Sequence, residues 1–380
     1  MRDQTHVLPQ SSGRDDPQAT GTAVYATRYV GLNRRQARLV LATLCLALAG
    51  CLAVSLGPAP KISTGTGQRD VDLNYAVAQR VRAGQGFYDA MGGELRARGY
   101  PLRSVFNWRT PLHLELIAHL PSPDWARILL LLGAACAIGL NVAAMCRDKH
   151  NALAGVQLLL LSMPLAITAM PHSYLFAEVW SGVLITMSVG LYALGWRPAG
   201  ASAGLLALFF RELALPYALI GAFLACREKR RLELCLWLAG IGCYAIHLGL
   251  DAMEVAARIP PAGVASMMTS WIQFGGVEFL LITSRMGLLL GFPFWVAALY
   301  LPLAVLGLVG WPNPVALRAA ATVGAYLLAF SVVGRPTMNF YWGAMYTPLL
   351  ALGATWAVPA CRDIVRAARA PSRRHTQSNR

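Results

Sequence analysis

The sequence predicts an all-α protein that is embedded in a membrane. Of its 380 residues 56% are hydrophobic and only 13% are charged, and the apolar residues fall in separate long runs. A typical soluble domain carries about twice this share of charged residues. Because a helix needs roughly 20 apolar residues to cross a bilayer core, we expect about eight full spans and one half-membrane hairpin.

The expected spans follow the apolar runs in order. They are residues 39–56, 125–145, 152–170, 179–196, 234–250, 286–309, 317–333 and 341–358. The runs 199–210 and 213–226 are short and meet at the charged pair Arg211 and Glu212. Charged groups at membrane depth require protein or water around them, so these two runs predict the hairpin.

The segments outside the spans indicate the topology. Residues 1–33 are polar without periodicity and predict a disordered tail. Residues 34–360 form the predicted transmembrane domain, and 361–380 a basic tail. Arginines precede the first span and crowd this tail, which places both termini on the cytoplasmic side. The long polar loops 57–124 and 251–284 are then extracytoplasmic.

The first outer loop is expected to contain interfacial helices. Residues 72–83 carry apolar side chains at helical spacing, and Gly84 follows them. Residues 112–120 predict a second helix of this kind after Pro111. Amphipathic helices of this type lie in the plane of the lipid–water interface.

The charge and cysteine patterns exclude other classes of function. The net charge of +15 is concentrated in short segments between apolar runs and in the C-terminal tail. This pattern favours lipid headgroups over nucleic acid as partners. The eight cysteines lie within or at the ends of apolar runs without a CxxC pair, so neither disulfides nor a cysteine zinc site is expected.

Asp70 and Asp72 are the candidate catalytic residues, because they stand two positions apart where the chain leaves the bilayer. A carboxylate partly removed from water at a membrane surface becomes a better proton acceptor, which suits a general base. Helix capping and metal binding are alternative roles for this pair.

Residues 70–88 resemble the first outer loop of C-type membrane glycosyltransferases, including bacterial polyprenyl-phosphate-mannose-dependent mannosyltransferases. The matching positions are Asp70, Tyr75, Ala78, Gly84 and Tyr88. The resemblance covers roughly residues 70–111 and implies Asp70 first, and Asp72 second, as the base. Asn74 replaces the first aromatic residue of the family's usual pair, so the choice between the two remains open.

The resemblance implies an inverting transfer of a sugar from a polyprenyl-phosphate donor to a hydroxyl of a glycan or lipid acceptor, in the bacterial inner membrane. Guanidinium groups suit the donor phosphate because they bind it bidentately. The expected phosphate or sugar ligands are Arg211, Arg109 and Arg335. Further expected contributors to the substrate site are Glu178, His172, Glu212, Tyr75 and Asn339.

No cofactor is expected, because the sequence has no HExxH, no GxSxG and no phosphate-binding glycine loop. A divalent metal has no support from residue spacing. Two other functions use the same features. A transporter or flippase for an anionic lipid-linked substrate would need the arginines but no base, and a non-enzymatic assembly subunit would need neither.

Overall fold

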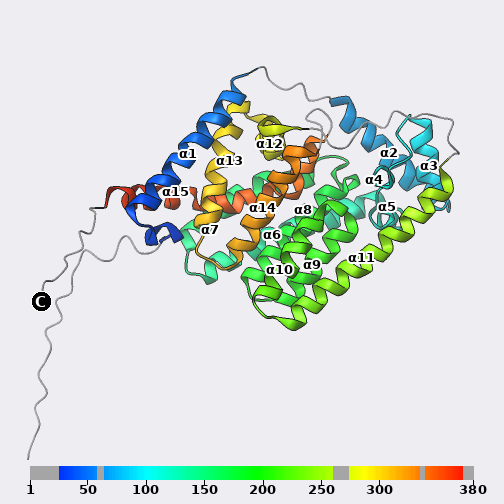
Figure 1. The fold of residues 1–380 in the computed structure, drawn as a ribbon. Coiled ribbons are helices and arrows are strands. Elements are labelled where there is room, and N and C mark those ends of the chain that lie inside the picture. Colours follow the sequence, from blue (N-terminus) through cyan, green and yellow to red (C-terminus); the bar gives the residue numbers. More distant parts are fainter. Residues whose placement is uncertain (1–24, 58–63, 260–273, 334–338, 371–380) are drawn as a thin grey trace, which may run out of the picture.

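The computed structural model describes residues 25–57, 64–259, 274–333 and 339–370 (Figure 1). In these residues the structure consists of helices joined by short connections. The helices are α1 (Arg34–Ser55), α2 (Thr64–Arg82), α3 (Phe87–Ala97), α4 (Val105–Trp108), α5 (Pro111–His119), α6 (Pro123–Arg147), α7 (Asn151–Leu165), α8 (Ala177–Ala193), α9 (Arg197–Phe210), α10 (Leu215–Arg227), α11 (Arg231–Arg258), α12 (Gly276–Ser284), α13 (Phe294–Gly310), α14 (Val315–Val332) and α15 (Thr347–Arg369).

Five of the described helices are long and apolar enough to cross a membrane: α1, α6, α7 with its short extension to Ala169, α11 and α14. Helices α8 and α13 are apolar but shorter. The all-helical membrane class predicted from the sequence is therefore supported, while the number of crossings stays a prediction. In Figure 1 α2 to α5 gather at one side of the molecule, whereas α1 and α13 lie at the other.

Local sequence explains where several helices begin and end. At the start of α1 the Asn33 side chain accepts from the Gln36 backbone, and Gln36 accepts in return from the Asn33 backbone. Prolines at the first turn begin α5 and α6, where a missing backbone N–H costs little. Gly84, with φ +92°, follows α2 and turns the chain toward α3.

The predicted break at Arg211 and Glu212 is present. Helix α9 ends at Phe210, a single 3-10 turn covers Glu212–Ala214, and α10 starts at Leu215. Helix α9 packs along α8, so the break lies beside the N-terminal end of α8. The Arg211 side chain is consequently buried in protein, and that of Glu212 is partly buried.

Several boundaries differ from the sequence prediction; α11, for example, runs to Arg258 although its span was predicted to end at residue 250. The span predicted at 286–309 is interrupted, because Gly287 has φ +101° and α13 starts only at Phe294. Helix α2 starts at Thr64, well before residue 72, and α15 runs past residue 358 to Arg369. Neither extension was visible from apolar runs, because the segment added to α2 is polar and the segment added to α15 carries four charged residues among its apolar ones.

Residues 25–33 were predicted to be part of a disordered tail, and this was wrong for them. The Thr27 backbone N–H and hydroxyl both donate to Asp363 of α15, at 2.9 and 3.0 Å. The Tyr29 hydroxyl donates to the Leu306 carbonyl of α13. These hydrogen bonds to distant residues hold residues 25–33 in place, and amino-acid composition does not reveal them. Residues 1–24 lie outside the described structure.

Two glycines allow α13 and α15 to cross closely. A methyl group on Gly307 would clash with the Gly353 carbonyl, and one on Gly353 would clash with the Ala304 carbonyl.

We predict that Gly307→Ala destabilises the protein by about 1–3 kcal/mol, because the helices must separate. Gly324→Ala on α14, where a methyl group meets open space, is the matched control. Thermal unfolding in detergent measures both, and equal melting temperatures would contradict the predicted close crossing.

Candidate active site

Asp70 and Asp72 lie on opposite faces of α2. Two residues apart on a helix means about 200° of rotation. Asp70 is 5% exposed, whereas Asp72 faces outward and accepts a hydrogen bond from the nearby Gln68 amide at 2.8 Å. Both lie beyond the first turn of a helix that starts at Thr64, so N-terminal capping is the wrong explanation for either. Burial singles out Asp70 as the candidate reactive carboxylate.

Two tyrosines hold the Asp70 carboxylate. The Tyr100 hydroxyl donates to Oδ1 at 2.8 Å and the Tyr341 hydroxyl donates to Oδ2 at 2.7 Å. Burial, followed by the neighbouring Asp70 charge, raises the pKa of Tyr100 above its ordinary value, so its phenol remains a donor. Neither tyrosine was predicted from the sequence to be a site residue. Tyr341 stands in a run of aromatic residues that is also typical of a membrane-interface belt.

Arg109 lies against the same carboxylate in an unusual backbone conformation. Its Nη2 is 3.4 Å from Asp70 Oδ2. Its φ of 61° and ψ of 168° fall in a region that is nearly restricted to glycine, at a cost of about 1–3 kcal/mol. Flanking contacts fix this geometry: the Trp108 indole donates to the Leu102 carbonyl, and the Thr110 hydroxyl donates to the Phe210 carbonyl. Strained residues of this kind concentrate at functional sites.

Charges alternate from Asp70 into the protein interior. Arg109 Nη1 is 3.9 Å from Glu178 Oε1, and Arg211 Nε is 3.0 Å from the same oxygen. Arg211 Nη1 in turn lies 3.1 Å from Glu212 Oε1. We call these five residues the charge chain: Asp70, Arg109, Glu178, Arg211 and Glu212. It joins α2, the α4–α5 connection, the first turn of α8 and the break between α9 and α10.

The charge chain is incompletely hydrogen-bonded within the described residues. Both carboxylate oxygens of Glu178 are buried without a hydrogen bond, as are Nε and Nη1 of Arg211 and Nη1 of Arg109. The ion-pair distances are short, but the N–H bonds do not aim at the oxygens. Unsatisfied buried groups are costly and usually mark a site that another polar group completes. These N–H groups therefore lie in ion pairs with Glu178 and Glu212 but make no well-aligned hydrogen bond to them.

His113 supports this region from α5. Its Nε2 lies 2.9 Å from the Tyr174 carbonyl, and its ring packs near Trp180 and Phe210. Burial lowers the pKa of His113 to about 4, so the ring is neutral at pH 7. A neutral histidine here fixes the chain just before Glu178 without adding a charge.

The remaining predicted site residues are placed differently. His172 has φ 63° and is exposed, with its ring centroid 6.4 Å from that of Tyr174. Tyr75 is also exposed, on another face of α2 from Asp70. Asn339 precedes the 3-10 segment Phe340–Met345, which carries Tyr341 to Asp70. Arg335 lies outside the described residues.

A metal-binding cluster is not found in the described part of the chain, where no group of three or more His, Cys, Asp or Glu side chains converges. A scan against protein-family models, a search of curated proteins and a search of solved structures each found no match.

Glu178 is expected to be the structural centre of the charge chain. Glu178→Gln removes the charge between two buried guanidiniums, and breaking a buried ion pair in this way costs about 3–5 kcal/mol. Glu228→Gln is the control, since Glu228 pairs at the surface with Arg230 at 2.6 Å and such pairs contribute about 1 kcal/mol or less. Unfolding in detergent distinguishes the two. Similar losses of stability in the two variants would show that the charge chain does not depend on Glu178.

Acid should weaken the fold through His113. Its folded pKa, about 4, is below the ordinary value of 6.5, so the unfolded state binds the proton first as pH falls. Stability is then fully present above about pH 6.5 and falls by ~2 kcal/mol between pH 7 and pH 5. His113→Gln should remove this part of the pH dependence, whereas His119→Gln, at an exposed residue, should leave it. Parallel pH profiles for the wild type and His113→Gln would contradict the prediction.

Proposed function

We propose that this protein is a membrane glycosyltransferase. It moves a sugar from a polyprenyl-phosphate donor to an acceptor hydroxyl with inversion of configuration at C1 of the sugar. The observation that carries the proposal is the contact between buried Asp70 and Arg109, at 3.4 Å, continued by Glu178 and Arg211. Such a reaction requires a base and a cationic phosphate site close together. The charge chain supplies both, and the resemblance of residues 70–88 to C-type glycosyltransferases agrees with it.

The proposed step needs one base and no external acid. Asp70 takes the proton of the acceptor hydroxyl, whose oxygen forms a bond to C1 of the sugar from the face opposite the phosphate. The C1–O bond to phosphate breaks, and the polyprenyl phosphate leaves with the electron pair. Phosphate is a good leaving group, so its stabilisation by cations replaces protonation.

The other residues have assigned roles in this proposal. Tyr100 and Tyr341 orient the carboxylate, and each carboxylate oxygen can accept a further hydrogen bond from the acceptor. Arg109 and Arg211 present N–H groups that bind the phosphate oxygens. Glu178 and Glu212 hold the two guanidiniums in place.

We further propose that the site faces the extracytoplasmic side of a bacterial inner membrane, with both termini cytoplasmic. Arg34, Arg35 and Arg38 are exposed at the start of α1, and Arg366 and Arg369 at the end of α15. Tyr341, in contrast, comes just before α15 begins. The positive-inside rule then places the basic ends in the cytoplasm and the Asp70 region outside.

The decisive test compares Asp70→Asn with Asp72→Asn. We expect Asp70→Asn to lower transfer of radiolabelled mannose from polyprenyl-phosphate mannose to membrane acceptors by about 10²-fold or more, because the base is lost. Asp72→Asn changes the same charge on the exposed face of α2 and should keep near wild-type activity. The assay uses the full chain in membrane vesicles.

Asp70→Glu separates this proposal from lipid transport. A base in a fixed geometry loses transfer when its carboxylate is displaced by a methylene group. The entrance of a lipid transporter that only attracts anions would keep its function in Asp70→Glu, because the charge at position 70 is unchanged. Full activity of both Asp70→Glu and Asp70→Asn would overturn the proposed role of Asp70.

A further inference from the structure

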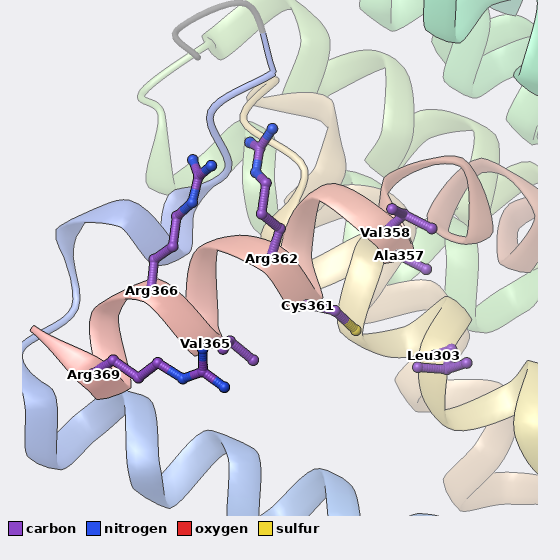
Figure 2. Close-up of a pocket in the computed structure, with 8 residues that line it drawn as sticks. All are labelled: Leu303, Ala357, Val358, Cys361, Arg362, Val365, Arg366 and Arg369. Carbon is purple, nitrogen blue, oxygen red and sulfur yellow. The ribbon is translucent and has the colours of Figure 1, made fainter.

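A second site lies where α13 and α15 meet, away from the charge chain. It is a pocket of about 550 Å³ (Figure 2). Its lining residues are Leu303, Ala357, Val358, Cys361, Arg362, Val365, Arg366 and Arg369. A pocket of this volume is within the usual range for small-molecule sites. Nothing in the proposed reaction uses it.

The pocket combines an apolar wall with a cationic end. Leu303 of α13 and Val358 and Val365 of α15 supply apolar surface, and Val358 is 78% exposed. Along α15 the lining begins with Ala357 and Val358 and continues to Arg362, Arg366 and Arg369, so it becomes more basic toward the C-terminal end of the helix. In Figure 2 Arg369 extends beside Val365 at the end of the helix. This polarity matches an amphiphile with an anionic head.

The arginines of the pocket differ in how they are used. Arg362 donates to the Asp363 carboxylate at 2.8 Å and to the Tyr25 carbonyl at 2.9 Å. Arg366 and Arg369 are exposed, and the described residues include no ion pair to either. The lining itself contains no carboxylate. Two guanidiniums are thus available for an anion beside an apolar surface.

The position along α15 favours a lipid over a soluble anion. Helix α15 has 23 residues and is about 35 Å long at 1.5 Å per residue, so its two ends lie far apart. Tyr341 at the charge chain precedes its start, and Arg369 is its last residue. Helix α1, with Arg34, Arg35 and Arg38 at its start, packs against α15. The pocket consequently lies at the end of α15 away from Tyr341, beside the basic start of α1, a helix that is long and apolar enough to cross a membrane.

We propose that this pocket binds an anionic phospholipid, with its phosphate held by Arg366 and Arg369 and an acyl chain along Leu303, Ala357 and Val358. Basic pockets between membrane helices on the cytoplasmic side hold anionic headgroups in this way. The site is separate from the proposed sugar transfer. A lipid here would join α13 to α15 at the end where residues 25–33 also pack.

Lipid binding to the purified full-length protein in detergent tests this. Native mass spectrometry would measure the apparent Kd for dioleoyl phosphatidylglycerol and, as the neutral-headgroup comparison, dioleoyl phosphatidylcholine. We expect phosphatidylglycerol to bind more tightly. Arg366→Gln combined with Arg369→Gln should weaken it about tenfold, because each basic side chain contributes to headgroup binding. Ala357→Phe, which fills the apolar part, should also weaken it without changing charge.

The control is Arg34→Gln combined with Arg35→Gln, which removes the same charge from the neighbouring helix but not from the pocket lining. It should change the Kd less than twofold. Equal weakening by the two double variants would show that only the overall charge matters, and would overturn the site. Equal binding of the two lipids, or full competition by millimolar inorganic phosphate, would overturn it as well.

Discussion

The buried contact between Asp70 and Arg109 is the interaction on which the proposed site depends. An ionised side chain removed from water is stable only beside an opposite charge and hydrogen-bond donors. Asp70 has both, from Arg109 and from the hydroxyls of Tyr100 and Tyr341. Neither Arg109 nor Asp70 could be enclosed alone. The elements that carry them must therefore pack together for the fold to form.

That requirement extends into the protein through Glu178. Its carboxylate is completely buried between the guanidiniums of Arg109 and Arg211. Arg211 reaches it only because the helix stops at Phe210 and restarts at Leu215. A continuous helix would carry the Arg211 side chain elsewhere on its surface. The interruption between α9 and α10 thus places the Arg211 guanidinium at the N-terminal end of α8.

Placing the Arg109 side chain at the site requires a strained backbone conformation at this residue. Its conformation is one that residues with a side chain rarely adopt, and it is stabilised by contacts on both sides. The incompletely hydrogen-bonded N–H groups in the same region have the same character. In the proposed function, a bound phosphate would complete the hydrogen bonding of these groups.

The sequence by itself determined the membrane class, the break at Arg211 and Glu212, and the candidate residues Asp70, Arg109, Glu178, Arg211 and Glu212. These follow from hydrophobic runs and from rare charges within them, which are properties of short stretches of chain. Only the tertiary structure decided which aspartate is enclosed, and it added Tyr100 and Tyr341 from distant segments. It also ordered residues 25–33 through Asp363 and extended α15 to Arg369. Burial and pairing depend on contacts between residues far apart along the chain, and composition and periodicity carry no record of those contacts.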